Sequence, residues 1–557
     1  MAVSHTNFFG PVGSTDASTT PTFGTLINVA TRTAVPLAMQ HLHLEGRASP
    51  AGAMLQVSHQ FKCGGDATKP LEAIYTFQLP KNGTLRRFLV KGPGFEAESK
   101  LTPREEARKE YEQGMQEGHL SVLAEAGPDG MITLSAGQVR PGDVVSVILD
   151  ILVGVQVVDK GFRFRFPFTM APNYHPQAKM TSTGDGIRME LPQGIFGDLI
   201  LPEWKDSAEG LHHISFKMYL DAGAPLDAVA SPSHRVLVRP GTGGTAEVEL
   251  AGDADVPNRD LVLDVITKDV APVLFADEGL VQKGKAVPDD PKVPKQAPKW
   301  TAIIPSSALP KAQASPRRVC FVLDRSGSMA GARIERAKAA LSVCLSALQS
   351  TDEFGLIHFG SDVVVFDRQM GPANDINRQR ANVWIRGIQA DGGTHLAQAL
   401  GEAVDVLGRP GDDIFLITDG EVSETGPIIE QAAAAGSRIH VLGLGAAAQD
   451  RFLSALSRRT GGVSEMMGVN EDVATKGLKL FNALRQPVQT EVKATIHMKG
   501  KDTQTFDVGT VFEGHPLILT DNGREGKTLP FKAVLFWNGG QVVVKLENTQ
   551  ATPDHLS

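Results

Sequence analysis

Cysteine is scarce in this sequence, and long apolar runs and blocks of like charge are missing from it. The 557 residues include 3 cysteines, an odd and sparse set that cannot form the disulfide framework of a small secreted protein. No window reaches about 18 uninterrupted apolar residues, so we expect no transmembrane helix and no membrane insertion. The net charge of -8 is spread along the chain, which argues against a nucleic-acid partner.

A secretory leader is also missing. Residues 1–22 are rich in Ser, Thr, Gly and Pro, and they show neither the basic nor the apolar region of a signal peptide. We predict that this stretch is a flexible tail. The few cysteines and the missing leader together favour a cytoplasmic location, with export by a non-classical route left open as the alternative.

The length and the patterning predict several domains, the first of them built from strands. At ~150 residues per domain, the chain corresponds to between three and four units. Apolar and polar residues alternate over 55–61 and 72–79, as in strands with one buried face. A capping box at 102–105 predicts one charged helix over 103–117, which we expect to be solvated, with a protein contact as the alternative. The β pattern continues to about residue 270.

After Arg318 the sequence changes to an alternation of strands and helices. A helix after the first strand carries one apolar face at spacings of three and four residues, made by Ile334, Ala337, Leu341, Leu345 and Leu348. A wholly apolar strand is expected at 319–323, and further strands, mainly apolar, are expected at 355–359, 414–418 and 439–444. Apolar strands that alternate with helices imply a parallel sheet covered on both faces. After Arg485 the pattern returns to strands.

Oxygen-bearing side chains gather at one end of this predicted sheet. Asp324 ends the first strand, with Ser326 and Ser328 just behind it, Thr394 follows a glycine-rich loop, and Asp419 follows the strand 414–418. Ligands of open α/β sheets bind at the carboxyl ends of the strands, so these five side chains can meet at one point. Hard oxygen ligands without His or Cys favour Mg²⁺ over zinc or copper, and Mn²⁺ and Ca²⁺ are the alternatives.

The order Asp-x-Ser-x-Ser, Gly-Gly-Thr, Thr-Asp-Gly resembles the metal-ion-dependent adhesion site (MIDAS) of a von Willebrand factor type A (VWA) domain. The five matching residues are Asp324, Ser326, Ser328, Thr394 and Asp419. The first half resembles the vault protein inter-alpha-trypsin (VIT) domain through segments such as Glu72–Pro80, Arg104–Glu112 and Phe164–Pro167. The whole chain is similar to the inter-alpha-trypsin inhibitor heavy chains and their intracellular relatives.

This resemblance implies a multidomain protein in which two β domains accompany an inserted α/β domain. The β-sandwich VIT domain and a hybrid-type β domain hold a doubly wound, Rossmann-like VWA domain. The expected parts are a tail (1–22), the VIT domain (23–174), a first hybrid-type segment (175–315) with a mobile Lys-, Pro- and Asp-rich loop (276–298), the VWA domain (316–487) and a C-terminal β segment that completes the hybrid-type domain (488–557).

The expected function is that of a non-enzymatic scaffold or adaptor. Its VWA domain would bind an acidic residue of a protein partner through Mg²⁺ at the five-residue site. A self-associating structural protein, in which the metal stabilises one copy or bridges two, is the first alternative. A Mg²⁺-dependent hydrolase is the less favoured one, because only His395 adjoins the site as a base and no phosphate-binding loop is present.

Two further patterns are interpreted as structural. His41 and His43 share one face of a strand and His212 and His213 are adjacent, but neither pair has a third partner at metal-ligand spacing. The Gly443-Leu444-Gly445 stretch lies on a late strand, so we interpret it as a tight turn and not as a dinucleotide fingerprint.

Overall fold

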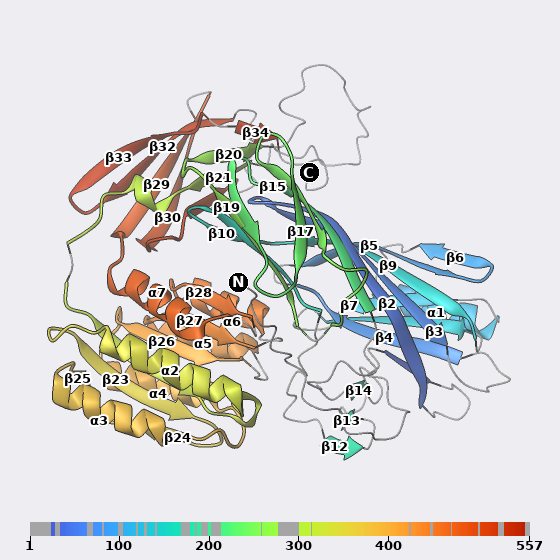
Figure 1. Ribbon diagram of the computed structural model, residues 1–557, viewed down its shortest axis with the longest axis horizontal. Helices are drawn as coiled ribbons and strands as arrows, with labels where there is room; N and C mark the ends of the chain where they lie inside the picture. Colours follow the sequence, from blue (N-terminus) through green and yellow to red (C-terminus); the bar gives the residue numbers. More distant parts are fainter. Residues whose placement is uncertain are drawn as a thin grey trace, which may run out of the picture.

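The structure of the protein is a computed structural model (Figure 1). Its described residues form three main units and one small separate sheet. It describes residues 24–27, 34–63, 71–80, 83–98, 104–117, 121–126, 131–139, 142–168, 179–183, 186–190, 199–201, 213–257, 259–276, 300–313, 315–420, 422, 425–445, 449–468, 471–499, 502–521, 529–547 and 549–551. The predicted tail 1–22 lies outside these residues, as does the predicted loop 276–298 except for Ala276.

The first unit is a β-structure with two main sheets. A 12-stranded sheet contains β1 (Gly24–Ile27), β2 (Ala34–Ser49), β3 (Gly52–Cys63), β4 (Leu71–Gln78), β5 (Thr84–Gly92), β6 (Phe95–Glu98), β7 (Val122–Ala126), β8 (Met131–Val139), β9 (Val144–Val153), β15 (His213–Asp221), β17 (Val236–Pro240) and β18 (Thr245–Leu250). A 4-stranded sheet contains β10 (Gln156–Val158), β11 (Gly161–Phe166), β16 (Leu226–Ala230) and β19 (Leu261–Thr267). One apolar core runs from Leu42 to Val265 and joins the two sheets.

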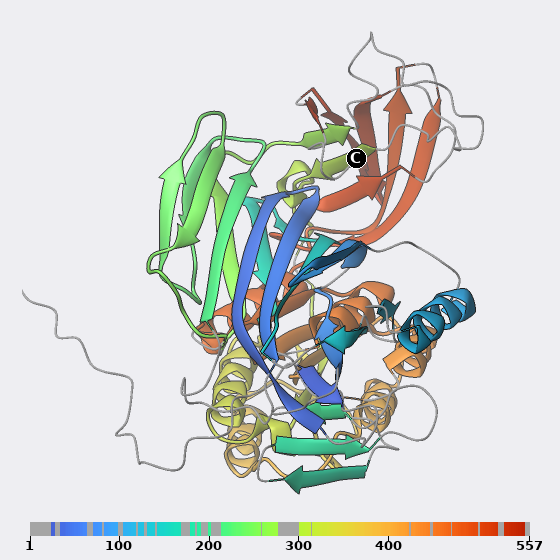
Figure 2. The ribbon, with the colours of Figure 1, turned by 90° about the vertical axis from the view of Figure 1, so that its right-hand side faces the viewer.

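The strand pairings correct the predicted boundary at residue 174. We had assigned 175–315 to the hybrid-type domain, but β15 pairs in parallel with β2, and β19 pairs with β11. Figure 2 shows the green strands β15 to β18 beside the blue N-terminal strands. The strands of residues 213–267 therefore lie in the same two sheets as the strands before residue 174 and share their core. A separate 3-stranded sheet contains β12 (Lys179–Thr183), β13 (Gly186–Glu190) and β14 (Leu199–Leu201).

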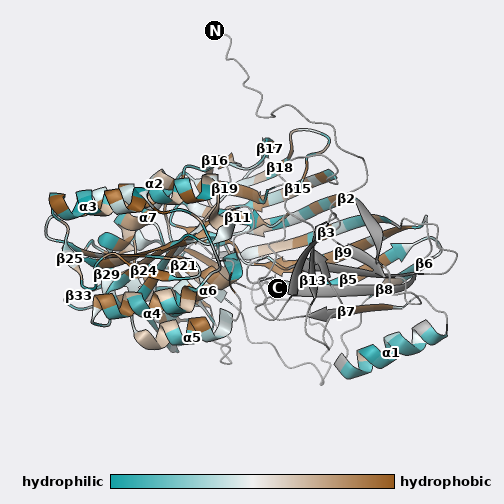
Figure 3. Ribbon diagram, turned by 90° about the horizontal axis from the view of Figure 1, so that it is seen from below, coloured by the Kyte–Doolittle hydropathy of each residue, from teal (hydrophilic) through white to brown (hydrophobic). Residues whose placement is uncertain are grey.

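Helix α1 (Arg104–Gln116) lies at the outer edge of this first unit. It falls within the predicted helix 103–117. Most of its length is hydrophilic (Figure 3), and Glu105 and Glu106 in its first turn are exposed. The expectation of a solvated helix fits this position.

The second unit is the α/β domain that the apolar strands predicted. Its 7-stranded sheet contains β22 (Arg318–Asp324), β23 (Glu353–Phe359), β24 (Val363–Val365), β25 (Gly371–Pro372), β26 (Asp413–Thr418), β27 (Arg438–Leu444) and β28 (Ser464–Met467). One core lies under α2 (Ala332–Ser346), α3 (Asp375–Arg386) and α7 (Val473–Arg485), and another lies under α4 (Leu396–Leu407), α5 (Thr425–Ala435) and α6 (Asp450–Arg459). Helices therefore cover both faces of the sheet, as predicted.

The strand order locates the binding edge of this sheet. The order β24-β23-β22-β26-β27-β28 has β22 in the middle, with the chain running first to β23 on one side and then to β26 on the other. This is the doubly wound order, and the direction of winding reverses between β22 and β26. The carboxyl ends of these two strands form the crevice in which such sheets bind ligands.

Strands from both sides of the α/β unit build the third unit. One sheet contains β20 (Val273–Ala276), β21 (Trp300–Ile304), β31 (Leu517–Thr520) and β34 (Thr549–Ala551), and the other contains β29 (Gln489–Met498), β30 (Thr503–Val511), β32 (Pro530–Trp537) and β33 (Gly540–Lys545). A single apolar core from Leu274 to Leu546 lies between them. The α/β unit is thus inserted between β21 and β29.

Strand β11 connects the first unit to the α/β unit. Successive side chains of a strand point to opposite faces, so Phe162, Phe164 and Phe166 enter the core of the first unit. Arg163 and Arg165 point the other way and bond to the α/β unit. Nη2 of Arg163 donates to Oε1 of Glu471 at 2.8 Å, and Nη2 of Arg165 donates to the carbonyl of Gly445 at 3.3 Å.

Candidate metal site

The two predicted carboxylates lie at the ends of neighbouring strands. Asp324 is the last residue of β22, and Asp419 directly follows β26. Because β22 and β26 pair in parallel, their ends meet at the same edge of the sheet. Both residues are buried, with exposed fractions of 0% and 1%. Two carboxylates are thus held together away from water.

Local hydrogen bonds fix the Asp324 carboxylate. Its Oδ1 accepts from the backbone N–H of Ser326 at 2.8 Å, and its Oδ2 accepts from the hydroxyl of Thr418 at 2.5 Å. The backbone N–H of Gly420 donates in turn to that hydroxyl at 2.9 Å. Gly420 has a φ of 77°, and a Cβ there would lie 2.9 Å from the side chain of Leu453, so the Thr-Asp-Gly turn requires glycine.

The serines and the threonine come from loops that are bonded to each other. The hydroxyls of Ser326 and Ser328 lie 3.1 Å apart in the loop after β22. The N–H of Gly327 donates to the carbonyl of Gly392 at 2.9 Å, which ties this loop to the segment that carries Thr394. Ser328 and Thr394 are half-buried. Their partial exposure leaves hydroxyl oxygens at the opening of a site whose carboxylates lie deeper.

The electrostatics of the pair show that two negative charges are unfavourable here. Burial, and after it the charge of Asp419, raise the pKa of Asp324 to about 7, although hydrogen bonds from Thr418 and Ser326 act in the opposite direction. The guanidinium of Arg333 reaches Asp419, with Nη1 at 3.5 Å from Oδ2. A cation between the carboxylates would relieve their repulsion.

The donor set fits a hard divalent cation. The two carboxylates lie beside the loop that carries Ser326 and Ser328, and a backbone bond ties that loop to the segment before Thr394; none of the five side chains is an imidazole or a thiolate. Among the described residues, no group of three or more His, Cys, Asp or Glu side chains could hold a metal ion. The candidate site contains only two carboxylates, so it is not such a group, and its remaining protein ligands would be hydroxyls.

Sequence reasoning missed several residues of this region. It did not single out Thr418, which bonds Asp324, or Arg333, which bonds Asp419. The Thr-Asp-Gly motif contains Thr418, so its hydroxyl could have been found there. The position of Arg333 on the first turn of α2 gives no comparable signal. His395, the only base proposed for a hydrolase, is exposed on the loop before α4.

A second group of side chains meets on the first unit. The parallel register of β2 and β15 pairs His41 with His213 and His43 with Ser215. The Ser215 hydroxyl lies 2.7 Å from Nδ1 of His43 and 3.0 Å from Nε2 of His41. Partial burial and then the charges of His43 and His213 lower the pKa of His41. We had treated the histidines as separate pairs, and the pairing of β2 with β15 brings three of them together. His212 lies outside the described residues.

Comparison with known domain families identifies both regions. The von Willebrand factor type A domain family matches residues 317–466, and the vault protein inter-alpha-trypsin domain family matches residues 39–151. The chain contains a VIT domain and a VWA domain. The first match contains all five residues of the candidate metal site. The second covers strands of the first unit from β2 to β9.

Several relatives share both domains or one of them. A von Willebrand factor A domain-containing protein of Dictyostelium discoideum is 25% identical over 76% of this chain and 41% of its own length. The human von Willebrand factor A domain-containing protein 5A is 24% identical over 77% of this chain and 55% of its own. Inter-alpha-trypsin inhibitor heavy chain H4 of Bos taurus is 29% identical over 38% of this chain and 25% of its own. The chain thus spans about half or less of the length of these relatives.

Two solved structures of VWA-containing proteins match part of the chain. A von Willebrand factor type A protein from Catenulispora acidiphila has 15% sequence identity and a TM-score of 0.36, over 51% of this chain and 74% of its own. Proximal thread matrix protein 1 from the mussel byssus, described with a zinc-occupied MIDAS motif, has 15% identity and a TM-score of 0.27, over 31% of this chain and 46% of its own. None of the helices in the described part of this chain is long and apolar enough to cross a membrane.

Proposed function

We propose that this protein is a non-enzymatic scaffold or adaptor that binds an acidic residue of a protein partner through a divalent cation. The convergence of the buried Asp324 and Asp419 with the hydroxyls of neighbouring loops carries this proposal. The cation would be held by Asp324, Ser326, Ser328, Thr394 and Asp419. The presence of a VWA domain supports a role in protein interaction.

The chemistry of the donors favours Mg²⁺. Hydroxyl and carboxylate oxygens are hard ligands, and Mg²⁺ takes about six of them, usually with some water. Mn²⁺ and Ca²⁺ accept the same ligands and are the alternatives. The raised pKa of Asp324 supports the proposal, because burial beside a second carboxylate disfavours the charged form unless positive charge is nearby.

The mixture of ligands favours an acidic partner. When bound, the cation supplies positive charge and an open coordination position at the surface of the domain. The three hydroxyls are neutral, so only the two carboxylates offset the positive charge of the cation. Ser328 and Thr394 are half-buried, and they line the route by which a partner's carboxylate would reach the site. Asp324 and Asp419 hold the charge in place and stay out of reach of solvent.

The two β units would hold the VWA domain and present its binding edge. The third unit joins both ends of the VWA domain, because β21 precedes it and β29 follows it in one core. The first unit contacts it through Arg163 and Arg165 of β11. Such a frame suits a scaffold, since it restricts how the binding edge can turn.

Isothermal titration of Mg²⁺ into chelator-stripped protein tests the proposal. We expect wild type to bind Mg²⁺ and Asp324→Ala to bind none. Asp375→Ala is the matched control, because Asp375 is an 86% exposed carboxylate on α3 of the same domain, and we expect it to bind as wild type does. Equal binding by wild type and Asp324→Ala, or no binding by either, would contradict the proposed site. Light scattering with and without Mg²⁺ then separates an adaptor from a self-associating protein.

A further inference from the structure

Arg333 extends to the rim of the candidate metal site from the first turn of α2. Its Nη1 donates to the carbonyl of Ser328 at 2.8 Å and lies 3.5 Å from Oδ2 of Asp419. The Arg333 side chain is 26% exposed, whereas that of Asp419 is 2% exposed. A positive, planar group is therefore held between a buried carboxylate and solvent.

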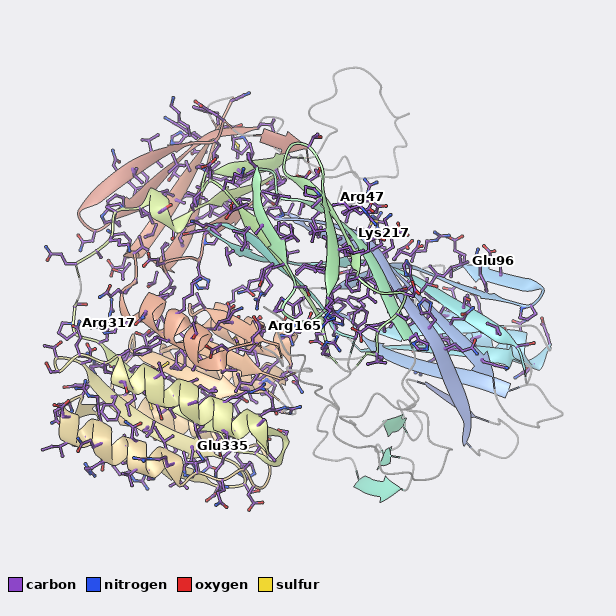
Figure 4. All side chains as sticks on the ribbon, in the orientation of Figure 1. Arg47, Glu96, Arg165, Lys217, Arg317 and Glu335 are labelled. Carbon is purple, nitrogen blue, oxygen red and sulfur yellow. The ribbon has the colours of Figure 1, made fainter. Side chains whose placement is uncertain are left out.

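The neighbouring domain fixes the surface on which Arg333 lies. A Cβ on Gly445 would lie 3.6 Å from Cζ and from Nε of Arg333, so the guanidinium packs against that glycine. Gly445 has a φ of 117°, a conformation that favours glycine. Its carbonyl accepts from Arg165 of the first unit, and Asp260 of the same unit accepts from Arg165 at 2.7 Å. Figure 4 shows Arg165 where the first unit meets the VWA domain.

Arg325, the arginine next to Asp324, has a different environment. Its Nη2 is paired with Asp362, and its Nε donates to Nδ1 of His358 at 3.2 Å. The side chain of Arg325 thus serves contacts with β23 and the loop behind it. Arg333, by contrast, bonds two residues of the metal site itself, Ser328 and Asp419.

The charges around the site suggest what Arg333 does. A divalent cation neutralises Asp324 and Asp419, and Arg333 then adds one positive charge at the opening. A guanidinium presents paired N–H groups that match the two oxygens of a carboxylate. Because Nη1 of Arg333 lies 3.5 Å from Oδ2 of Asp419, one of the proposed ligands, the guanidinium would border a carboxylate that a partner brought to the cation.

We propose that Arg333 is a specificity-determining residue of the metal site, which binds the partner's carboxylate beside the cation and so selects an acidic ligand over a neutral one. This inference rests on the proposed function. It predicts opposite effects on the two ligands. Arg333 repels the cation and attracts the carboxylate, so its removal strengthens the binding of metal and weakens the binding of carboxylate.

The test uses the whole 557-residue chain, Mn²⁺ as the metal probe and acetate as the carboxylate probe, at constant ionic strength. Mn²⁺ affinity comes from the relaxation rate of water protons, and acetate affinity comes from the fall in that rate as acetate displaces water from the bound Mn²⁺. In Arg333→Gln, we expect the Kd of Mn²⁺ to fall about threefold, as screened repulsion by one charge implies. We expect the Kd of acetate to rise about tenfold, as the loss of a charged hydrogen bond implies.

Two further variants control for charge and shape. Arg368→Gln removes the same charge from a side chain that is 85% exposed and lies 3.5 Å from Glu402, and we expect both affinities to stay as in wild type. Arg333→Lys keeps the charge but loses the paired donors, so it should restore part of the acetate affinity. An acetate Kd that is unchanged or lower in Arg333→Gln, with Mn²⁺ still bound, overturns the inference alone. Failure of wild type to bind Mn²⁺, or equal binding by Asp324→Ala, overturns the proposed function.

Discussion

Replacement of Asp324 by asparagine should stabilise the metal-free protein while it abolishes metal binding. Asparagine keeps the shape of the side chain and removes its charge. In wild type the carboxylate is 0% exposed, and burial followed by the charge of Asp419 raises its pKa to about 7. A buried carboxylate that is kept for metal binding should lower the free energy of unfolding when no metal is bound.

The magnitude depends on pH, and its sign follows from the raised pKa. Between the ordinary pKa of an aspartate and about 7, the folded protein keeps a proton on Asp324 that the unfolded chain has released. The unfolding free energy of wild type therefore falls as pH rises through this range, by about 4 kcal/mol in total at pH 8. The NH₂ group of asparagine cannot accept a hydrogen bond. One of the two bonds to residue 324, from the Ser326 N–H or from the Thr418 hydroxyl, is therefore lost, which costs about 1 kcal/mol. We thus expect a net gain of about 3 kcal/mol at pH 8, and about none near pH 4.5.

Denaturation of the full-length protein in chelator measures this difference. Calorimetric scans are recorded between pH 5 and pH 8. The unfolding transition that Mg²⁺ shifts in wild type is assigned to the VWA domain, and that transition is followed. Mg²⁺ at about 100 times its Kd should raise the stability of wild type by about 2.7 kcal/mol, and it should leave Asp324→Asn unchanged. Asp375→Asn, on the exposed face of α3, controls for the loss of one negative charge.

Two results would refute this reasoning. The first is an Asp324→Asn protein that is less stable than wild type at pH 8 in chelator, because the buried pair would then not be repulsive. The second is a difference between the proteins that does not change with pH, because the effect would then come from packing and not from ionisation.

Two further predictions concern the first unit. Arg163→Ala should destabilise the protein by about 2 kcal/mol, because Asp264 and the buried Glu471 lose the guanidinium that they share, while Lys476 stays paired with Glu471. Urea denaturation measures the loss, and an unchanged midpoint for Arg163→Ala would contradict the prediction. Burial and then the charge of Arg259 lower the pKa of His234 to about 4, so the unfolding free energy should fall by about 3 kcal/mol as pH falls from 6.5 to 4. His234→Phe, which keeps the ring beside Phe168 and Phe216, should flatten that dependence, and an equally steep one would sink the idea.

The α/β domain and the convergence of its loops could be predicted because local signals determine them. Mainly apolar strands that alternate with amphipathic helices imply a parallel sheet, and the structure has that sheet. The reversal of winding between β22 and β26 then brings Asp324 and Asp419 together, although they are far apart in sequence. No side-chain contact had to be known for this step.

The grouping of the β-strands could not be predicted in the same way. Alternation shows that a segment is a strand, but it does not show which sheet the strand joins. The pairing of His41 with His213 connects strands separated by most of the VIT domain, and nothing in either segment specifies the other. For that reason residues 213–267 were assigned to the wrong unit, and the meeting of the histidines was missed.

Strand β11 shows why the contact between the domains was hidden in the sequence. An alternation of Phe and Arg over 162–166 is typical of a strand with one buried and one solvated face. Here both faces are buried, since Arg163 is 6% exposed and is paired with Glu471 of the VWA domain. A buried charge is costly unless it is paired, so the arginines of β11 require the VWA domain beside them.

The same strand links the frame of the protein to its candidate metal site. Arg165 is bound by Asp260 within the first unit and donates to the carbonyl of Gly445 in the VWA domain. Gly445 is the surface on which Arg333 lies, and Arg333 bonds Ser328 and Asp419. An unbroken series of contacts therefore runs from the core of the first unit to a side chain that borders the metal ligands. This contact between the first unit and the α/β domain lies next to the residue on which Arg333 packs. The position of Arg165 thus places a contact of the first unit directly behind Arg333, so a change in that contact would be felt at the edge of the candidate metal site.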